Sequence, residues 1–427
     1  MKLKLVRSVA SGAVSIMLVL ATQQAASAYS VLTHEAIIDG TWDDSIKPLL
    51  AKRFPRATAD QFREARAYSY GGAIIQDMGY YPFGSKTFSD LVHYVRSGDF
   101  IEALLREAGN LNEYAFALGA LAHYAADNEG HSIAVNPVVP VLYPKLRAKY
   151  GNRVTYAEDP IAHLRTEFGF DVLQVVRNRY ASQSYHDFIG FEVSKPVLER
   201  AFKHTYGVEL KDLFGSVDLA LATFRRSVSV VIPEMTKVAW ETKKDEIEKA
   251  APGVTRERFI YNLSRADYEK EWGGQYEKPG GLEKTLAVFL RIMPKVGPLA
   301  PLSFRPATPE AERLFVESLD ATLTRYRALL RQARAGTANL QNTDFDTGKS
   351  TRAGEYKLAD KTYAKLLKRL DRNGFSDITP ELRQNILAFY SDLNAPIETK
   401  KDREEWQDTL QALNRLKAAV TQASRNQ

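Results

Sequence analysis

The stretch from Asn110 to His131 reads NLNEYAFALGALAHYAADNEGH. Up to Ala126 it is rich in alanine and leucine, with no proline and one glycine, which predicts a helix. His123 and Asp127 stand four residues apart on that helix, so their side chains would share one face, one turn apart. An imidazole and a carboxylate in this arrangement can reach the same metal ion.

A second pair has the same spacing, because His163 and Glu167 are also separated by one helical turn. Nitrogen and oxygen ligands of these types suit zinc. His131 follows Gly130, where the first helix is expected to end, and is therefore expected to serve a second metal nearby. One such pair alone is more often packed or solvent-exposed, but the two pairs together favour metal binding.

The remainder of the chain also predicts helices, and no segment alternates as a strand would, so the predicted fold class is all-α. Thr308-Pro309 and Thr379-Pro380 are helix-start signals, and Gly336 is a stop signal. The further helices are expected over 188–206, 216–232 and 308–335, from Pro380 through Leu382, Ile386, Phe389 and Leu393, and around Trp406, Leu410, Leu413 and Val420.

Prolines and glycines concentrate between Trp240 and Pro306, which predicts a domain boundary there. We expect a first domain over 29–245 and a C-terminal helical region of unknown role over 246–427. All 7 histidines lie in the first part. A histidine-based site must therefore lie there, and the second part is interpreted as scaffold, lid or partner surface.

Residues 1–28 have the pattern of a secretory signal, with a basic start, an apolar run over 9–20 and the small-residue cleavage sequence Ala26-Ser27-Ala28. The apolar run is too short for a transmembrane helix. The mature protein is expected to begin at Tyr29 and to be periplasmic or secreted.

Composition narrows the possible functions. The chain has no cysteine, which excludes disulfides and a cysteine nucleophile. Its formal charge is +6, and removing the three basic residues of the predicted signal leaves 55 basic and 52 acidic residues, a charge of +3. Such a slight excess does not by itself argue for nucleic-acid binding.

The expected mature start, Tyr29-Ser30-Val31-Leu32-Thr33-His34, completes a pattern that resembles the zinc-dependent phospholipase C superfamily. This superfamily includes bacterial phospholipases C, secreted single-strand nucleases and the catalytic part of glycosylphosphatidylinositol-specific phospholipase D. In its members the first mature residue binds zinc through its amino nitrogen and carbonyl, and a nearby histidine binds the same ion. An aspartate, a histidine, a His-x3-Asp helix, another histidine and a His-x3-Glu or His-x3-Asp pair follow.

The resemblance implies three zinc ions, with Asp127 bridging two of them, and covers roughly Tyr29 to Trp240. Asp77 would also orient the attacking water. The implied ligands are Tyr29, His34 and Asp127 for one ion, Asp77, His93, His123 and Asp127 for its close partner, and His131, His163 and Glu167 for the third.

Two departures from the family pattern stand out. Many members begin with tryptophan where this chain would begin with Tyr29, which matters little because the ligand atoms belong to the backbone. The spacing from Asp127 to His131 is shorter than in the phospholipases C and nucleases and closer to the phospholipase D version. That spacing leaves the substrate class open.

The function implied is that of an exported phosphodiesterase of the phospholipase C type, acting on phospholipid at a membrane surface. A nuclease or another phosphodiesterase using the same site is the alternative enzyme, and the charge leans against nucleic acid. A non-catalytic helical protein stabilised by zinc is the alternative outside enzymes. No stable protein partner can be inferred from the sequence.

Three aromatic residues between Asp77 and His93 are candidates for contact with substrate, namely Tyr80, Tyr81 and Phe83, although packing explains them equally well. His186 and His204 fall outside the pattern and are interpreted as structural. Asp344 and Asp346 resemble the start of a calcium loop without its full ligand set, so a solvated loop is the favoured interpretation.

Overall fold

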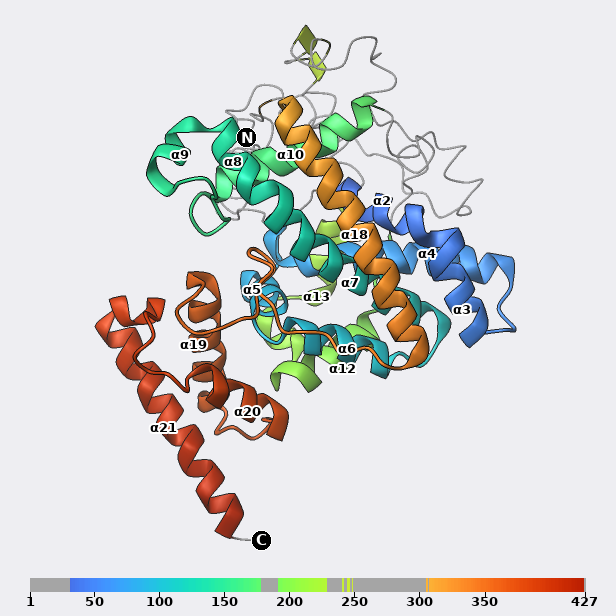
Figure 1. The fold of residues 1–427 in the computed structure, drawn as a ribbon. Coiled ribbons are helices and arrows are strands. Elements are labelled where there is room, and N and C mark those ends of the chain that lie inside the picture. The colour runs from blue at the N-terminus through green and yellow to red at the C-terminus, as the bar shows by residue number, and fades with distance from the viewer. Residues whose placement is uncertain are drawn as a thin grey trace, which may run out of the picture.

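The computed structural model describes residues 31–177, 191–228 and 307–425, together with residues 240–241, 244–245, 248 and 305. These residues form helices joined by short loops, and the only β-pairing among them is an isolated bridge between Thr343 and Ser350 (Figure 1). The predicted all-α fold class is confirmed. No helix within the described ranges has both the length and the apolarity needed to cross a bilayer.

The first part of the chain is a run of short helices around one long central helix, α7 (Leu111–Glu129), which begins at the capping residue Asn110. The elements before it are α2 (Val31–Thr41), η1 (Trp42–Ile46), α3 (Lys47–Arg53), α4 (Ala59–Ile74), η2 (Ile75–Tyr80), α5 (Lys86–Tyr94) and α6 (Ser97–Glu107). Those after it are η3 (Gly130–Val135), α8 (Asn136–Leu142), α9 (Pro144–Tyr150), α10 (Pro160–Arg177), α12 (Lys195–Tyr206), η4 (Leu210–Leu213) and α13 (Val217–Arg226).

Helices α4 and α7 pack with their backbones almost in contact, and two glycines make this possible. A Cβ atom on Gly72 would overlap the carbonyl oxygen of Phe116, and one on Gly119 would overlap the carbonyl oxygen of Ser69. The hydroxyl of Ser69 donates to the carbonyl oxygen of Ala115 across the same junction at 3.1 Å. The close approach fixes the start of η2, which continues directly from α4, relative to α7.

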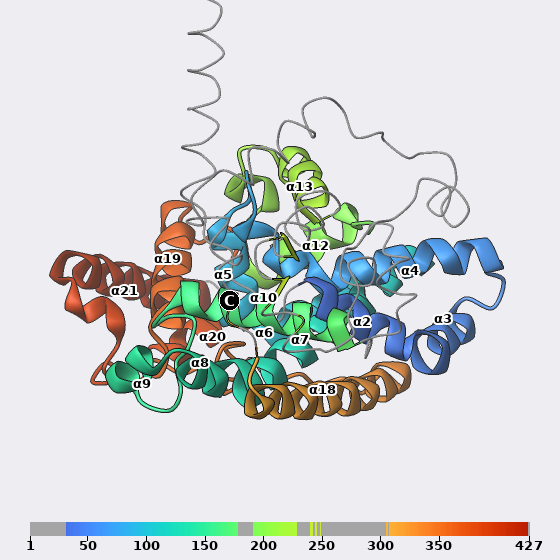
Figure 2. The same ribbon diagram turned by 90° about the horizontal axis from the view of Figure 1, so that it is seen from above.

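The second part of the chain packs directly on this bundle. Helix α18 (Pro309–Ala335) lies against α7 and η3, and the hydroxyl of Tyr326 donates to the carbonyl oxygen of Leu118 at 2.9 Å. Seen from above, α18 follows one side of the molecule and α13 the opposite side (Figure 2). The remaining elements are α19 (Lys357–Arg372), α20 (Pro380–Phe389), η7 (Glu398–Lys401) and α21 (Arg403–Arg425).

A loop of the second part, residues 340–356, runs from α18 across α6 towards α5 before entering α19 (Figure 1). We call it the strap. One hydrophobic cluster contains buried side chains of both parts. The division at residue 245 stays a prediction, because most of the residues around it lie outside the described ranges.

Several helix limits differ from those predicted. The helix expected over 188–206 begins only at Lys195, because Pro196 favours the first turn and residues 191–194 are not helical. Leu393 lies beyond the end of α20 and is exposed. Gly130 does not end the central helix, since its backbone is right-handed helical and the chain continues as the π-turn η3.

Candidate metal centre

Six elements bring eight of the nine predicted ligands to one buried region. Each of these residues is at most 2 % exposed, which is unusual for ionisable residues. The ligands come from α2 (His34), η2 (Asp77), α5 (His93), α7 (His123 and Asp127), η3 (His131) and α10 (His163 and Glu167).

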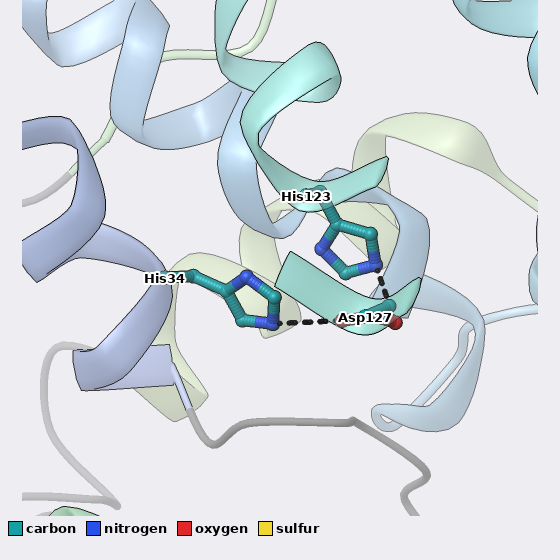
Figure 3. Close-up of side chains that lie close together, drawn as sticks. All are labelled: His34, His123 and Asp127. Atoms are coloured by element: carbon teal, nitrogen blue, oxygen red, sulfur yellow. Dashed lines mark ion pairs between the residues drawn. The ribbon is translucent and has the colours of Figure 1, made fainter. Parts of the chain in front are cut away.

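The carboxylate of Asp127 lies between histidines of three different helices. Its Oδ1 is 3.4 Å from Nε2 of His34, and its Oδ2 is 3.1 Å from Nε2 of His123 (Figure 3). The same Oδ2 is 3.5 Å from Nε2 of His93. The two oxygens of one buried carboxylate thus face two separate sets of imidazoles.

Asp77 joins the second of these sets. Its Oδ1 lies 3.4 Å from Nε2 of His93, which in turn is 3.4 Å from Nε2 of His123. Two groups of potential ligands can therefore be distinguished around Asp127, one with His34, His123 and Asp127 and one with Asp77, His93 and His123.

These separations fit a metal better than hydrogen bonds. A tetrahedral zinc ion with ligand distances near 2.0–2.1 Å keeps its ligand atoms about 3.3 Å apart. Direct hydrogen bonds between these groups would be shorter, near 2.7–3.0 Å. Neither oxygen of Asp127 has a hydrogen-bond partner of acceptable geometry, although both are buried. The donor set and its spacing therefore fit zinc.

The far ring nitrogens fix which atom each histidine presents. Nδ1 of His93 lies 2.8 Å from the carbonyl oxygen of Ser89, and Nδ1 of His123 lies 2.8 Å from that of Ala73. A carbonyl oxygen only accepts, so Nδ1 carries the hydrogen in both rings and Nε2 keeps its lone pair for a metal. The close packing of α4 on α7 places the Ala73 carbonyl where His123 needs it.

A third group lies between η3 and α10 and consists of His131, His163 and Glu167. Oε1 of Glu167 is 2.6 Å from Nδ1 of His163 and 3.7 Å from Nε2 of His131. These three residues would hold a zinc ion with one ligand fewer than a closed structural site has, which is the ligand number of catalytic zinc sites.

The electrostatics of the first two groups favour a positive charge at their centre. Burial lowers the pKa of His34 to about 4, so this imidazole is neutral at pH 7. Burial acts in the same direction on His93, but Asp127 and Asp77 outweigh it and raise the pKa of His93 to about 10. The carboxylates thus draw a cation into the cluster, and a bound metal ion would satisfy them in the same way.

The third group has the opposite balance. Burial lowers the pKa of His163 to about 4 and raises the pKa of Glu167 to about 8. Both groups therefore prefer their neutral forms when the site holds no cation. A divalent ion bound there would compensate for the burial of the Glu167 charge.

Asp171 extends the ligand-bearing face of α10 by one more turn. Its Oδ1 accepts from the hydroxyl of Thr33 at 2.5 Å, and its Oδ2 accepts from the backbone N–H of Leu32 at 3.2 Å. These bonds hold the start of α2, which carries His34. The spacing of four residues after Glu167 was the signal in the sequence that could have identified Asp171.

The three candidate aromatic residues do not share one surface. Tyr80 is buried with its ring 5.9 Å from that of His93, and Tyr81 packs on Phe224 at 4.6 Å. Phe83 is 48 % exposed and has a left-handed backbone, with φ of 62°. Of the three, Phe83 is therefore the best placed to contact a large external partner.

The prediction that Asp344 and Asp346 lie in a solvated loop is wrong. Both residues are 2 % exposed, and Phe345 between them lies against His93 and His131. The ring of Phe345 is 5.2 Å from that of His93, and its N–H donates to the His93 carbonyl oxygen at 3.2 Å. Sequence reasoning missed this contact because nothing local links a loop of the second part to histidines of the first.

Some predicted residues lie apart from the candidate ligand groups or outside the described ranges. Tyr29, the predicted signal over 1–28 and His186 lie outside the described residues. His204 is exposed on α12, with its side chain 52 % accessible, and belongs to none of the three candidate ligand groups.

Comparison with known proteins gives one match. Residues 33–216 match the model of a family described as zinc dependent phospholipase C. The match begins one residue before His34 and includes all the candidate ligands except Tyr29. No curated protein and no solved structure matches the chain.

Proposed function

Because residues 33–216 match the model of the zinc-dependent phospholipase C family, we propose that this protein is a zinc-dependent phosphodiesterase that hydrolyses phospholipids. The position of Asp127 carries the proposal. Its two buried oxygens face His34 on one side and the His93–His123 pair on the other, at 3.1–3.5 Å. A carboxylate so placed can bridge two metal ions.

The ligands divide into sets for three zinc ions. His34 and Asp127 would hold one zinc ion, Asp77, His93, His123 and Asp127 a second, and His131, His163 and Glu167 a third. Zinc ions bound there would supply a water of lowered pKa and would neutralise charge on the phosphoryl group. Asp77 faces the shared cluster through Oδ1, so it can also accept a proton from that water and orient it towards phosphorus.

The proposal includes export and an N-terminal ligand. The resemblance assigns the amino group of Tyr29 to the ion held by His34, and only removal of residues 1–28 would free that group. The bond network of Asp171 supports this assignment, because it anchors Leu32 and Thr33 close to the place where Tyr29 would have to lie.

A comparison of substrates tests the proposed activity. Protein beginning at Tyr29 and loaded with zinc is incubated in parallel with a phospholipid panel and with single-stranded DNA. We expect release of diacylglycerol or phosphatidic acid and no cleavage of DNA. Cleavage of DNA without lipid products would establish the nuclease alternative, and zinc binding without either activity would establish the non-catalytic one.

Exposure of Phe83 supports contact with a lipid surface and can be tested separately. Phe83→Ala should raise KM for phospholipid vesicles several-fold and leave the hydrolysis of a soluble short-chain phospholipid unchanged. Leu393→Ala is the matched control, because Leu393 is another exposed apolar residue, 36 % accessible, in the second part of the chain. Equal KM values for both variants on vesicles would contradict the role of Phe83.

Metal analysis tests the site independently of activity. The wild-type protein should bind about three zinc ions, and Asp127→Asn should lose up to about two, because Asn offers one weak oxygen where a carboxylate offers two. Glu129→Gln is the control, since Glu129 is the next acidic residue on α7 and pairs with Arg325 instead. A wild-type protein that binds no zinc under zinc-replete conditions would overturn the proposal.

A further inference from the structure

The strap, residues 340–356, lies outside the family match and yet reaches the third ligand group. It is tied to the first part of the chain along its length. The hydroxyl of Tyr124 donates to the carbonyl oxygen of Gln341 at 3.0 Å, and the hydroxyl of Ser97 donates to that of Thr343 at 2.6 Å. Phe345 is fully buried and Asp346 is 2 % exposed.

The backbone of the strap fixes the ring of His131. Nδ1 of His131 lies 2.9 Å from the carbonyl oxygen of Phe345. Since this oxygen only accepts, Nδ1 must carry the hydrogen, and Nε2 keeps the lone pair that faces Glu167. The Phe345 carbonyl of the strap thus orients the ring of His131, just as the Ala73 carbonyl orients the ring of His123.

The same stretch fixes His163 through one intermediary. Oδ1 of Asn136 lies 2.9 Å from Nε2 of His163, and Nδ2 of Asn136 donates to the carbonyl oxygen of Asp346 at 2.5 Å. That bond sets the orientation of the amide, so Oδ1 accepts from Nε2–H of His163. Nδ1 of His163 is then left with its lone pair towards Glu167.

The side chain of Asp346 holds this arrangement in place. Its Oδ2 accepts from the hydroxyl of Tyr94 at 3.1 Å and from that of Tyr356. Its Oδ1 lies 3.5 Å from Nδ1 of His131, on the side where the ring carries its hydrogen. A carboxylate behind a histidine ligand is the outer partner that orients the ring and raises its basicity in zinc proteins.

We infer that Asp346 is a positioning residue for the third zinc ion, and that the strap completes the surroundings of three ligands, His131, His163 and Glu167, which all come from the range matched by the family model. This inference rests on the proposed function, because it concerns the same centre. Partners of this kind typically change metal affinity 10- to 100-fold when removed. It also assigns a role to part of the C-terminal region.

Zinc competition with a chromophoric chelator, on the full mature chain, tests the inference without relying on activity. Asp346→Ala should weaken one of the bound ions about 10- to 100-fold and leave the other two unchanged. Asp346→Asn should lie between wild type and Asp346→Ala, because the amide still accepts from the tyrosines but lacks the charge. Cobalt bound in the weakened site should show an altered visible spectrum.

A milder second variant keeps the inference testable if Asp346→Ala does not fold. Tyr356→Phe removes one hydroxyl from Asp346 and keeps the buried ring, so the fold should persist while the same ion is weakened to a lesser degree. This change alters no other residue of the strap.

A matched pair of glycine variants tests the position of the strap itself. Gly348 has φ of 70°, and a Cβ there would lie 2.8 Å from the carbonyl oxygen of Asn128. Gly336 has the same φ and no atom within 4 Å of such a Cβ. Gly348→Ala should therefore displace the strap and weaken the same ion as Asp346→Ala, whereas Gly336→Ala should bind zinc as the wild type does.

The outcomes separate the two proposals. A wild type that binds no zinc overturns the proposed function and this inference with it. A wild type that binds about three ions, with Asp346→Ala and Tyr356→Phe binding all of them equally tightly, overturns the inference alone. Equal weakening of all ions in step with a lower free energy of unfolding would also overturn it, because that is the result of a merely structural role.

Discussion

The hydroxyl of Thr33 donates a 2.5 Å hydrogen bond to Oδ1 of Asp171, and this bond joins the first ligand-bearing helix to the last. Both groups are buried. Asp171 stands one turn beyond Glu167 on α10, and Thr33 stands one residue before His34. The third ligand group and the His34 group therefore share a rigid support.

Removing this support should weaken the ion held by His34. We expect Asp171→Ala to lower the affinity of that ion about 10-fold or more, because His34 loses the anchor of its helix. Thr33→Val, which keeps the bond from the N–H of Leu32 to Asp171, should have a smaller effect. Chelator competition measures both, and wild-type affinity in both variants would show that Asp171 has no such role.

The junction of α4 and α7 should tolerate no added methyl group. Gly119→Ala would place a Cβ on the carbonyl oxygen of Ser69, so we expect a loss of about 1–3 kcal/mol or more in the free energy of unfolding. Gly215→Ala is the control, since a Cβ at Gly215 meets nothing within 4 Å. Urea unfolding of the zinc-free proteins measures the difference, and two equally stable variants would contradict the packing described.

Ionisation of Asp344 should lower the free energy of unfolding of the zinc-free protein as the pH rises. Burial, with a smaller contribution from Asp346, raises the pKa of Asp344 to about 7 against the opposing effects of Thr347 and Lys349. A raised pKa in the folded state means that folding favours the protonated form. Its contribution to stability is therefore full below the unfolded pKa near 3.8 and is lost as the pH rises through about 7.

The Asp344→Asn variant tests this. Between pH 5 and pH 8 the free energy of unfolding should fall by roughly 2 kcal/mol less in the variant than in the wild type. Asp377→Asn, at an exposed carboxyl, should behave as the wild type. Identical pH dependence in all three proteins would mean that Asp344 ionises as it does in water.

An extra residue before Tyr29 should nearly abolish activity. The proposal makes the Tyr29 amino nitrogen a ligand, and a peptide nitrogen cannot replace it because its lone pair is delocalised. Protein beginning at Met-Tyr29 should therefore fold but bind one ion weakly. It is compared with protein beginning at Tyr29 at equal zinc, and equal activity with equal zinc content would exclude the N-terminal ligand.

Much of this arrangement could be predicted from local sequence, because helical spacing has a direct geometric meaning. The pairs at 123 and 127 and at 163 and 167 needed only the 3.6-residue period to be placed on one face. The start of α18 at Thr308-Pro309 followed from capping rules, and the structure confirms it.

The errors arose where tertiary contacts decide. Gly130 was expected to end a helix, but α18 packs on η3 and the chain stays helical through a π-turn. Asp344 and Asp346 were interpreted as solvated because their sequence is polar. They are buried because Tyr94, Tyr356 and Thr347 supply hydrogen-bond donors, and no local pattern predicts partners up to 252 residues away.

That separation in sequence has a consequence for how the protein is made. Tyr94 leaves the ribosome long before Asp346, and His131 and Asn136 likewise precede the carbonyl oxygens of the strap that they contact. Domains begin to form from the N-terminal side during synthesis. On the proposed function, a nascent chain that ends before the strap should therefore bind zinc only weakly at His131, His163 and Glu167, and tight binding there should arise only once the strap has been synthesised.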